Sequence, residues 1–378
     1  MVIIPVPVYN ILDKGWQPRS IGLLSIYAGA RVSPVMSDET SGAWQGTRQK
    51  RIMDVSIPTA RAGDGLRPVE LSRDLPQVIE LLKMVFDDTL DGDERQYFGD
   101  SAGTVNEILY RMNPMASRLS NGFVWQENGR IVGNASLLST RAWDRYLVAN
   151  VAVHPSYRRR GIARALMEAT TEAVRKRGGR TILLQVVKDN QQALDLYRSL
   201  GYISLGNMTT WYAVRSRIRQ IPVDSDGSSQ PFITSFPLRR WREAYELDTA
   251  HVHRDLNWPE PLQPDAYRRT WWQRAMDFMN GRHLETWVTT DLDDKLIGLA
   301  NISSEWGRSH LVTLRIRPDY SGRLERPLLA KVIRRLQYLP YRNVRIDHPE
   351  SDEYVDQILR EANFTVQRTL THMRLDLS

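Results

Sequence analysis

Hydrophobic positions along the chain follow two different periods from residue 66 onward. Apolar residues spaced three and four positions apart indicate helices, whereas short apolar or alternating runs indicate strands. Gly201 directly follows the last helical segment of the first half and would end it. The predicted helices are about residues 74–86, with Asp74 as the cap, 105–112, 162–176 and 190–200.

Short apolar segments around these helices have the length and composition of strands. Asn128-Gly129 separates two of them, and this pair supplies the positive φ values of a tight hairpin turn. The predicted strands are residues 66–69, 122–126, 130–138, 148–153 and 181–187, with one or two more in 202–214. The mixture of strands and helices predicts an α/β protein with a mixed sheet.

The second half of the sequence repeats the first. Three segments recur in the same order, at an offset that drifts only from about 165 to 162 residues, which indicates two copies of one fold. The matching pairs are residues 128–137 with 293–302, 151–157 with 314–320, and 197–202 with 359–364.

Stretches without periodicity divide the chain into four parts. We predict an irregular or partly disordered N-terminal arm over residues 1–64, a first domain over 65–220, a linker over 221–231 and a second domain over 232–378. The polar run 223–230 marks the linker. The arm could instead be an extension upstream of a start codon at Met36 or Met53, or an ordered segment whose best candidate strand is 23–27.

Composition excludes several classes of protein. With 42% hydrophobic and 25% charged residues, the chain is not wholly disordered. It contains no Cys, and therefore no disulfide, thiolate nucleophile or Cys-based zinc site. No apolar run is long enough for a membrane span, and the first residues make a poor signal peptide, so we expect a cytoplasmic protein. The net charge of +7 favours anionic ligands without by itself indicating nucleic acid.

A basic turn between a strand and a helix is the strongest candidate for a binding site. The strand over 148–153 ends, Arg158, Arg159 and Arg160 follow, and a helix opens at Gly161. The first N–H groups of a helix lack partners, and the helix dipole adds positive charge, so such a start binds phosphate. Read alone, the turn could equally be a solvated basic loop or a nucleic-acid patch.

Two motifs together resemble a known family. They are Arg158-x-x-Gly161-x-Ala163 and, about thirty residues later, Asn190-x-x-Ala193-x-x-Leu196-Tyr197-x-x-x-Gly201-Tyr202. They resemble the acyl-CoA signature and the following motif of the GNAT superfamily of N-acetyltransferases. The resemblance implies two tandem GNAT domains, each a mixed, mostly antiparallel sheet flanked by helices. It also implies acetyl-CoA as co-substrate, no metal, and a small-molecule or peptide amine as acceptor.

The resemblance further implies roles for individual residues. Tyr197 would be the catalytic acid that protonates the departing thiolate, since a phenol is protonated at neutral pH. The same side chain lies on an apolar helix stripe and could simply be a core aromatic. The implied acetyl-CoA contacts are Val151, Ala152, Val153, Arg158, Arg159, Arg160, Gly161, Ile162, Ala163, Arg164, Asn190 and Ala193.

The general base and the acceptor remain open from the sequence. Relatives that acetylate protein N-termini often carry a Glu where this chain has Gln185, which cannot act as a base. Asp189 acting through water and His154 in the basic turn are the alternatives. The acidic segment 87–100 could attract a cationic amine or could be a solvated loop. Nucleic acid is the weakest of the partners considered.

The second copy lacks the residues that carry the chemistry. We therefore expect it to bind acetyl-CoA poorly, to pack on the first copy and to wall its acceptor site. The substituted positions are Leu324 opposite Gly161, Arg326 opposite Ala163 and Leu359 opposite Tyr197. The tryptophans concentrated there could line a pocket or pack between the domains: Trp241, Trp258, Trp271, Trp272, Trp287 and Trp306.

These features lead to one expected function and one alternative. The expected function is an N-acetyltransferase that passes an acetyl group to a primary amine by direct attack in a ternary complex. The alternative is a non-catalytic acyl-CoA-binding sensor or scaffold, which the absence of a Glu at position 185 would favour.

Overall fold

The computed structural model describes residues 64–86, 121–140, 142–223, 231–257, 262, 267–279, 281–305 and 308–377. Nearly all of the N-terminal arm, the helix expected over 105–112, the acidic segment 87–100 and most of the linker lie outside the described residues.

The same order of elements occurs in both halves of the chain. The first half contains β1 (Gly65–Pro68), α1 (Leu71–Phe86), β2 (Asn121–Glu127), β3 (Arg130–Ser139), β4 (Arg145–Val153), η3 (Pro155–Tyr157), α5 (Ile162–Lys176), β5 (Thr181–Val187), α6 (Gln191–Ser199) and β6 (Ile203–Ala213). The second contains β7 (Thr234–Ser235), α7 (Trp241–His251), η6 (Arg254–Leu256), α8 (Trp271–Met279), β8 (His283–Thr290), β9 (Leu296–Ser304), β10 (His310–Ile316), η7 (Pro318–Tyr320), α9 (Glu325–Leu336), β11 (Val344–Pro349), α10 (Glu353–Glu361) and β12 (Thr365–Asp376). The structure therefore contains two copies of one fold, as the sequence repeats predict.

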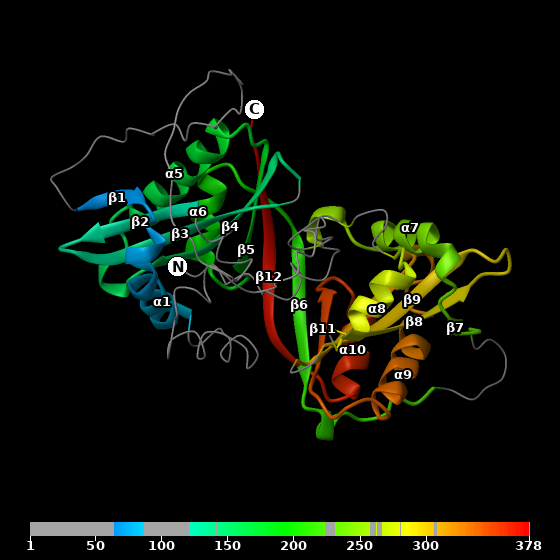
Figure 1. Ribbon diagram of the computed structural model, residues 1–378. Helices are drawn as coiled ribbons and strands as arrows, with labels where there is room; N and C mark the ends of the chain where they lie inside the picture. Colours follow the sequence, from blue (N-terminus) through cyan, green and yellow to red (C-terminus); the bar gives the residue numbers. More distant parts are fainter. Residues whose placement is uncertain are drawn as a thin grey trace, which may run out of the picture.

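The two copies exchange their last strands. The described strands form one 12-stranded sheet in the order β1-β2-β3-β4-β5-β12-β6-β11-β10-β9-β8-β7. Strand β12 of the second copy therefore lies between β5 and β6 of the first, and β6 in turn lies between β12 and β11 (Figure 1). Strand pairing thus joins the two copies into one sheet.

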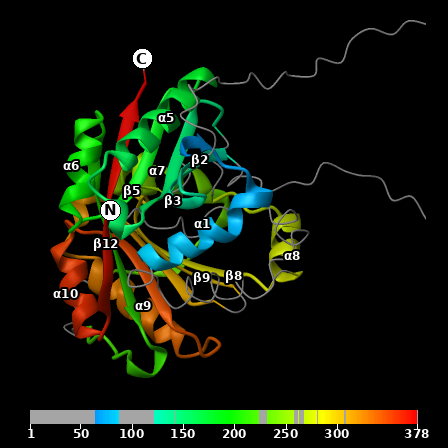
Figure 2. The same cartoon turned by 90° about the vertical axis from the view of Figure 1, so that its left-hand side faces the viewer.

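Helices cover both faces of this sheet (Figure 2). On one face, α5 and α6 pack on β2–β5 and β12, and α9 and α10 pack on β6 and β9–β11, in two separate hydrophobic cores. On the opposite face, α1 packs on β2, β3 and β4, and α7 packs on β8 and β9. Alternate residues of each strand thus point to different helix layers, as the period of a strand requires.

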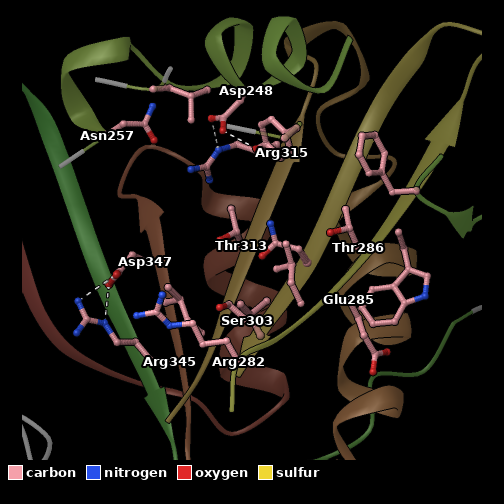
Figure 3. Close-up of a pocket in the computed structure, with 18 of the residues that line it drawn as sticks. Asp248, Asn257, Arg282, Glu285, Thr286, Ser303, Thr313, Arg315, Arg345 and Asp347 are labelled. Carbon is pink, nitrogen blue, oxygen red and sulfur yellow. Dashed lines mark hydrogen bonds and ion pairs between the residues drawn. The ribbon is translucent and has the colours of Figure 1, made fainter. Parts of the chain in front are cut away.

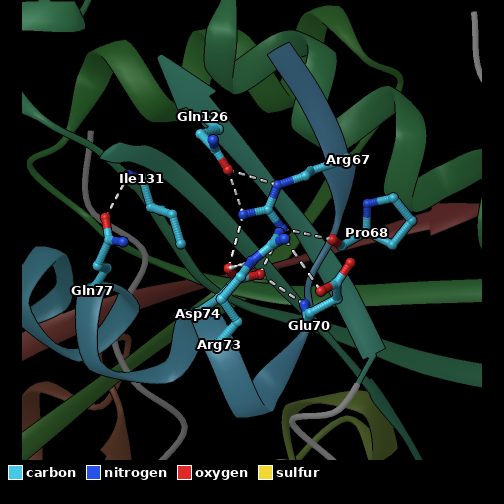
Figure 4. Close-up of polar contacts among 8 residues, drawn as sticks. All are labelled: Arg67, Pro68, Glu70, Arg73, Asp74, Gln77, Gln126 and Ile131. Carbon is cyan, nitrogen blue, oxygen red and sulfur yellow. Dashed lines mark hydrogen bonds and ion pairs between the residues drawn. The ribbon is translucent and has the colours of Figure 1, made fainter. Parts of the chain in front are cut away.

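A buried ion pair fixes the start of α1 (Figure 4). Arg67 donates to both carboxylate oxygens of Asp74, at 2.6 and 2.8 Å, and to Gln126 Oε1 at 2.9 Å. The carboxylate of Asp74 also accepts from the Glu70 N–H at 2.7 Å, just before the helix begins at Leu71. The prediction of Asp74 as the first cap is therefore wrong by about one turn, because its side chain reaches backward from inside the helix.

Candidate functional site

Strands β4 and β5 separate partway along their length. Their parallel pairing covers Arg145↔Thr181, Tyr146↔Ile182 and Leu147↔Leu183, whereas β4 continues to Val153. The last third of β4 pairs with β3 alone among the described strands. Backbone groups of β4 that face β5 are therefore available to an extended ligand. Val151, Ala152 and Val153, which the resemblance implies as acetyl-CoA contacts, lie in this part of β4.

A β-bulge bends β4 at the point where the strands part. The register against β3 shifts between Ser136↔Ala149 and Asn134↔Ala152, and Asn150 between them has φ 53°. Asn134 Nδ2 donates to Asn150 O at 2.8 Å and holds the bulge. Such a bulge redirects the backbone next to a site. In the second copy, β9 and β10 keep one constant register over their described pairs, so this feature is specific to the first copy.

The loop between β4 and α5 has the geometry of an anion cradle. Gly161 adopts the left-handed conformation, with φ 78°, and α5 starts directly after it. The first bond of the helix runs from Ala165 N–H to Gly161 O at 3.0 Å, which leaves the N–H groups of residues 162–164 without helical acceptors. A Cβ added at Gly161 would meet no atom within 4 Å, so the space before the helix is open. This arrangement fits a diphosphate.

The arginines of the loop are exposed and brace it. Arg158 Nε donates to Val153 O at 3.3 Å, so one backbone group at the end of β4 already has a partner. Arg160 pairs with Glu127 at 3.3 Å, and Arg164 donates to a serine of α6 at 2.7 Å. Arg159 has a positive φ of 66°. These side chains surround the cradle with positive charge at the surface.

Tyr197 on α6 is fully buried, yet its hydroxyl makes no hydrogen bond with the described residues. Its ring packs in the core beneath α5 and α6 and lies edge-on to Tyr202, with ring centroids 5.8 Å apart. Burial raises the pKa of Tyr197 well above its ordinary value, so the phenol stays protonated. A buried polar atom without a partner is uncommon, and a ligand atom that accepts a proton would satisfy it.

Other candidates have structural roles here. The Asn190 side chain accepts from the Ala193 N–H at 3.2 Å and so caps α6. His154 caps η3 by accepting from the Ser156 N–H at 3.2 Å, so this ring serves the turn. Asn190 therefore holds the start of α6, and His154 stabilises the turn after β4.

His372 is a residue that sequence reasoning missed. Strand β12 aligns it with Gln185 on β5, and the two side-chain nitrogens Nε2 lie 2.9 Å apart. The Gln185 amide nitrogen donates, so His372 Nε2 accepts. Burial lowers the pKa of His372 to about 4, which keeps the ring neutral at pH 7 and makes it a weak base. We infer that His372 holds the side chain of Gln185 in position. No sequence pattern predicts that residues this far apart form a pair.

The second copy also covers the α1 face of the first copy. Asp255 of η6 is buried and pairs with Arg145 of β4 at 2.6 Å and with Arg374 of β12 at 3.0 Å. Burial opposes ionisation of Asp255, but the two arginines outweigh it and hold its pKa below the ordinary range. A segment of the second copy is thereby fixed across the central strands of the sheet.

In the second copy, the corresponding loop binds the side-chain carboxylate of Glu325. The carboxylate of Glu325, 1% exposed, accepts from the Gly322 N–H at 2.9 Å and from the Leu324 N–H at 3.1 Å. Leu324 stands where the first copy has Gly161, and its φ is −108°. Two N–H groups of the loop just before α9 are thus already bound to a side chain.

The tryptophans of the second copy do not share one role. Trp287 is buried and lines a cavity, whereas Trp271 and Trp272 are 75% and 56% exposed and contact each other edge-on. Trp258 and Trp306 lie outside the described residues.

No described helix combines the length and apolar character needed to cross a membrane. Within the same ranges, no group of three or more His, Asp or Glu side chains is arranged to hold a metal ion.

Comparison with known proteins identifies the family. A model described as Acetyltransferase (GNAT) family matches residues 88–202. The [ribosomal protein bS18]-alanine N-acetyltransferase of Escherichia coli (strain K12) is 36% identical over 116 residues, which make up 31% of this chain and 70% of that protein. The N-alpha-acetyltransferase RimI of Mycobacterium tuberculosis is 34% identical over 91 residues, covering 24% and 56% of the two chains.

Similarity of structure extends over both halves. The crystal structure of a GCN5-related N-acetyltransferase from Sphaerobacter thermophilus matches with a TM-score of 0.55 at 16% identity, covering 82% of this chain and 95% of that one, which shows a shared fold. Together with the exchanged repeat and the named N-acetyltransferase relatives, these matches show that the chain belongs to the GNAT family of acetyltransferases, in a tandem arrangement.

Proposed function

We propose that the first copy binds acetyl-CoA and transfers its acetyl group to a primary amine by direct attack in a ternary complex. The observation that carries this proposal is the open cradle at Gly161 beside the slot between β4 and β5. A helix start suits the diphosphate, and free backbone groups suit the amide-rich pantetheine arm. Membership of an acetyltransferase family favours this function over a non-catalytic sensor.

Different groups of the first copy bind the phosphates, polarise the thioester carbonyl and donate the proton. The thioester supplies an activated acetyl group. N–H groups at residues 162–164 hold the phosphates, and a β4 N–H near the bulge polarises the thioester carbonyl. The amine nitrogen bonds to the carbonyl carbon as the carbon–sulfur bond breaks, and the Tyr197 hydroxyl gives its proton to the sulfur. The amine nitrogen loses one proton to solvent, and solvent returns a proton to the Tyr197 phenolate, so that the step balances. The bound orientation of the two substrates supplies much of the remaining acceleration.

The acceptor we propose is the amine of a peptide or of a small cationic molecule. One of the relatives is named for acetylation of an alanine of ribosomal protein bS18, which favours a peptide N-terminus. Acetylation assays with an alanine-terminated peptide and with spermidine would separate the two classes. We expect the peptide to be the better acceptor, and faster turnover of spermidine would reverse this order.

Titration of acetyl-CoA into the protein tests the nucleotide site. We expect one site per chain in the wild type and none in Gly161→Glu, because the new carboxylate would lie where the phosphates bind. Gly178→Glu is a matched control: Gly178 has φ 75° and open surroundings like Gly161, but it follows the far end of α5. The control should bind as the wild type does.

Two other results would contradict the proposal. Two sites per chain would mean that the second copy also binds acetyl-CoA despite Glu325. No binding to folded wild type would remove the basis for catalysis by the first copy.

A further inference from the structure

The second copy contains a cavity of about 600 Å³ on the sheet face that carries α7 and α8 (Figure 3). Its walls come from β8–β11, from α7 and α8, and from strands β6, β12 and β5. The volume is typical of small-molecule sites. The cradle at Gly161 does not contribute to it, so the cavity is separate from the proposed phosphate site.

The lining of the cavity carries an excess of positive charge. Its ionised groups are six arginines (Arg269, Arg274, Arg282, Arg315, Arg345 and Arg368) and four carboxylates (Asp248, Asp277, Glu285 and Asp347). An excess of guanidinium groups in a partly enclosed space attracts anions.

The carboxylates at the centre are already satisfied within the protein. Asp248 accepts from Arg315 Nε at 2.7 Å and from the Tyr267 hydroxyl at 2.6 Å. Asp347 accepts from Arg345 Nη2 at 3.0 Å and from a threonine hydroxyl of β6. The negative charges therefore orient the arginines rather than offer a site for a cation.

The atoms without partners point to the chemistry of the ligand. Asn257 and Arg282 are among the lining residues, and their atoms Nδ2 and Nε are buried without an acceptor among the described residues. Both atoms are N–H donors, and leaving such groups unsatisfied is costly. A ligand that carries hydrogen-bond acceptors would complement these two donors and the excess of arginines.

We propose that this cavity binds a small molecule carrying two or more carboxylate or phosphate groups. The second copy then acts as a ligand-binding module within an acetyltransferase. In the second copy, Glu325 binds the N–H groups of the loop before α9, whereas the opposite face of the sheet has an open cavity. Strands β5 and β12 form one wall, so the bound ligand would lie against Gln185 and His372 of the shared sheet.

Titration of citrate and of inorganic pyrophosphate tests this proposal. Both titrations use the full chain with Gly161→Glu, so that the cradle of the first copy is blocked whether or not it binds acetyl-CoA. We expect at least one probe to bind at one site per chain. Adding Arg282→Met or Asn257→Leu should weaken that binding about tenfold or more, the usual effect of losing a hydrogen bond to a charged group.

Arg334→Met is the matched control, because Arg334 is an exposed arginine of α9 on the opposite face of the sheet. It should leave the affinity unchanged, and circular dichroism should show that all variants keep the wild-type fold. Absence of binding by both probes at millimolar concentration would overturn the proposal. So would binding that neither cavity substitution weakens. Neither result would bear on acetyl-CoA binding by the first copy.

Discussion

Tyr197 is both a core residue and the proposed acid, and the two roles predict different effects of one substitution. Tyr197→Phe keeps the ring in the core and removes a buried hydroxyl that lacks a described partner. We expect stability to be unchanged or higher, acetyl-CoA affinity to be unchanged, and kcat to fall about 100-fold or more. Steady-state kinetics and thermal unfolding measure these effects.

The neighbouring Tyr202 provides the control for this experiment. Its ring is also buried and lies edge-on to Tyr197, so Tyr202→Phe makes the same chemical change in the same core. We expect that variant to keep most of the activity. Equal activity of Tyr197→Phe and wild type would show that Tyr197 only packs in the core.

Glu325 is expected to stabilise the second copy by acting as a built-in anion. In Glu325→Ala, the N–H groups of Gly322 and Leu324 lose their acceptor, which should lower the free energy of unfolding by about 1–3 kcal/mol. Inorganic phosphate should then raise the Tm of the variant more than that of the wild type, because only the variant has an open site.

Glu353→Ala is the comparison for this test, since Glu353 is an exposed glutamate in the first turn of α10. It should cost little stability and show no selective effect of phosphate. If Glu325→Ala lost as little stability as Glu353→Ala and phosphate raised its Tm no further, the Glu325 carboxylate would not occupy an anion site.

At the scale of single elements, α1 depends on its buried ion pair. Burial opposes ionisation of Asp74, but hydrogen bonds from Arg67 and from the Glu70 N–H outweigh it and lower the pKa of Asp74 to about 2. The ordinary value is near 4, so between these pH values the unfolded chain binds the proton more readily than the folded one. The stabilisation is therefore present above about pH 4 and is lost as the pH falls towards 2.

Substitutions at the two arginines test this anchor. Arg67→Met should destabilise the protein by about 3 kcal/mol at pH 7, because it leaves a buried carboxylate without its main partner. Arg73→Met should cost under about 1 kcal/mol, since Arg73 is 55% exposed. Urea unfolding measured over a range of pH would show both effects, and equal losses in the two variants would contradict the assignment.

The sequence predicts local elements well where one short signal decides them. Helix α5 and strand β5 have the expected bounds, and both residues of the Asn128-Gly129 turn have positive φ. The cradle at Gly161 was predictable for the same reason, since strand, turn and helix are contiguous.

The parts of the candidate site that come from the second copy were not predictable. His372 and Asp255 reach the first copy through strand exchange and through η6. A repeat in the sequence shows that two copies exist, but it does not show which copy each last strand joins. Both exchanged and unexchanged pairing bury the same hydrophobic pattern, so the pattern cannot distinguish them.

At the scale of the whole molecule, strand exchange makes each copy incomplete without the other. A chain of residues 64–223 alone would leave β5 without β12 and expose an unpaired edge. We expect this chain to form a dimer in which β6 of each molecule pairs with β5 of the other, or to aggregate. Analytical ultracentrifugation measures this outcome, and a stable monomer with native-like circular dichroism would contradict it.

The exchange also has a consequence for the order in which the protein is made. Gln185 and His372 pair across 187 residues, so β5 leaves the ribosome long before its neighbour β12 has been synthesised. Domains that fold as they emerge normally complete the N-terminal one first. Here the edge of β5 stays unpaired until β12, the last strand of the chain, has been made. The second copy therefore supplies the strand that completes the sheet of the first, which gives the chain a reason to keep a copy whose corresponding loop is filled by Glu325.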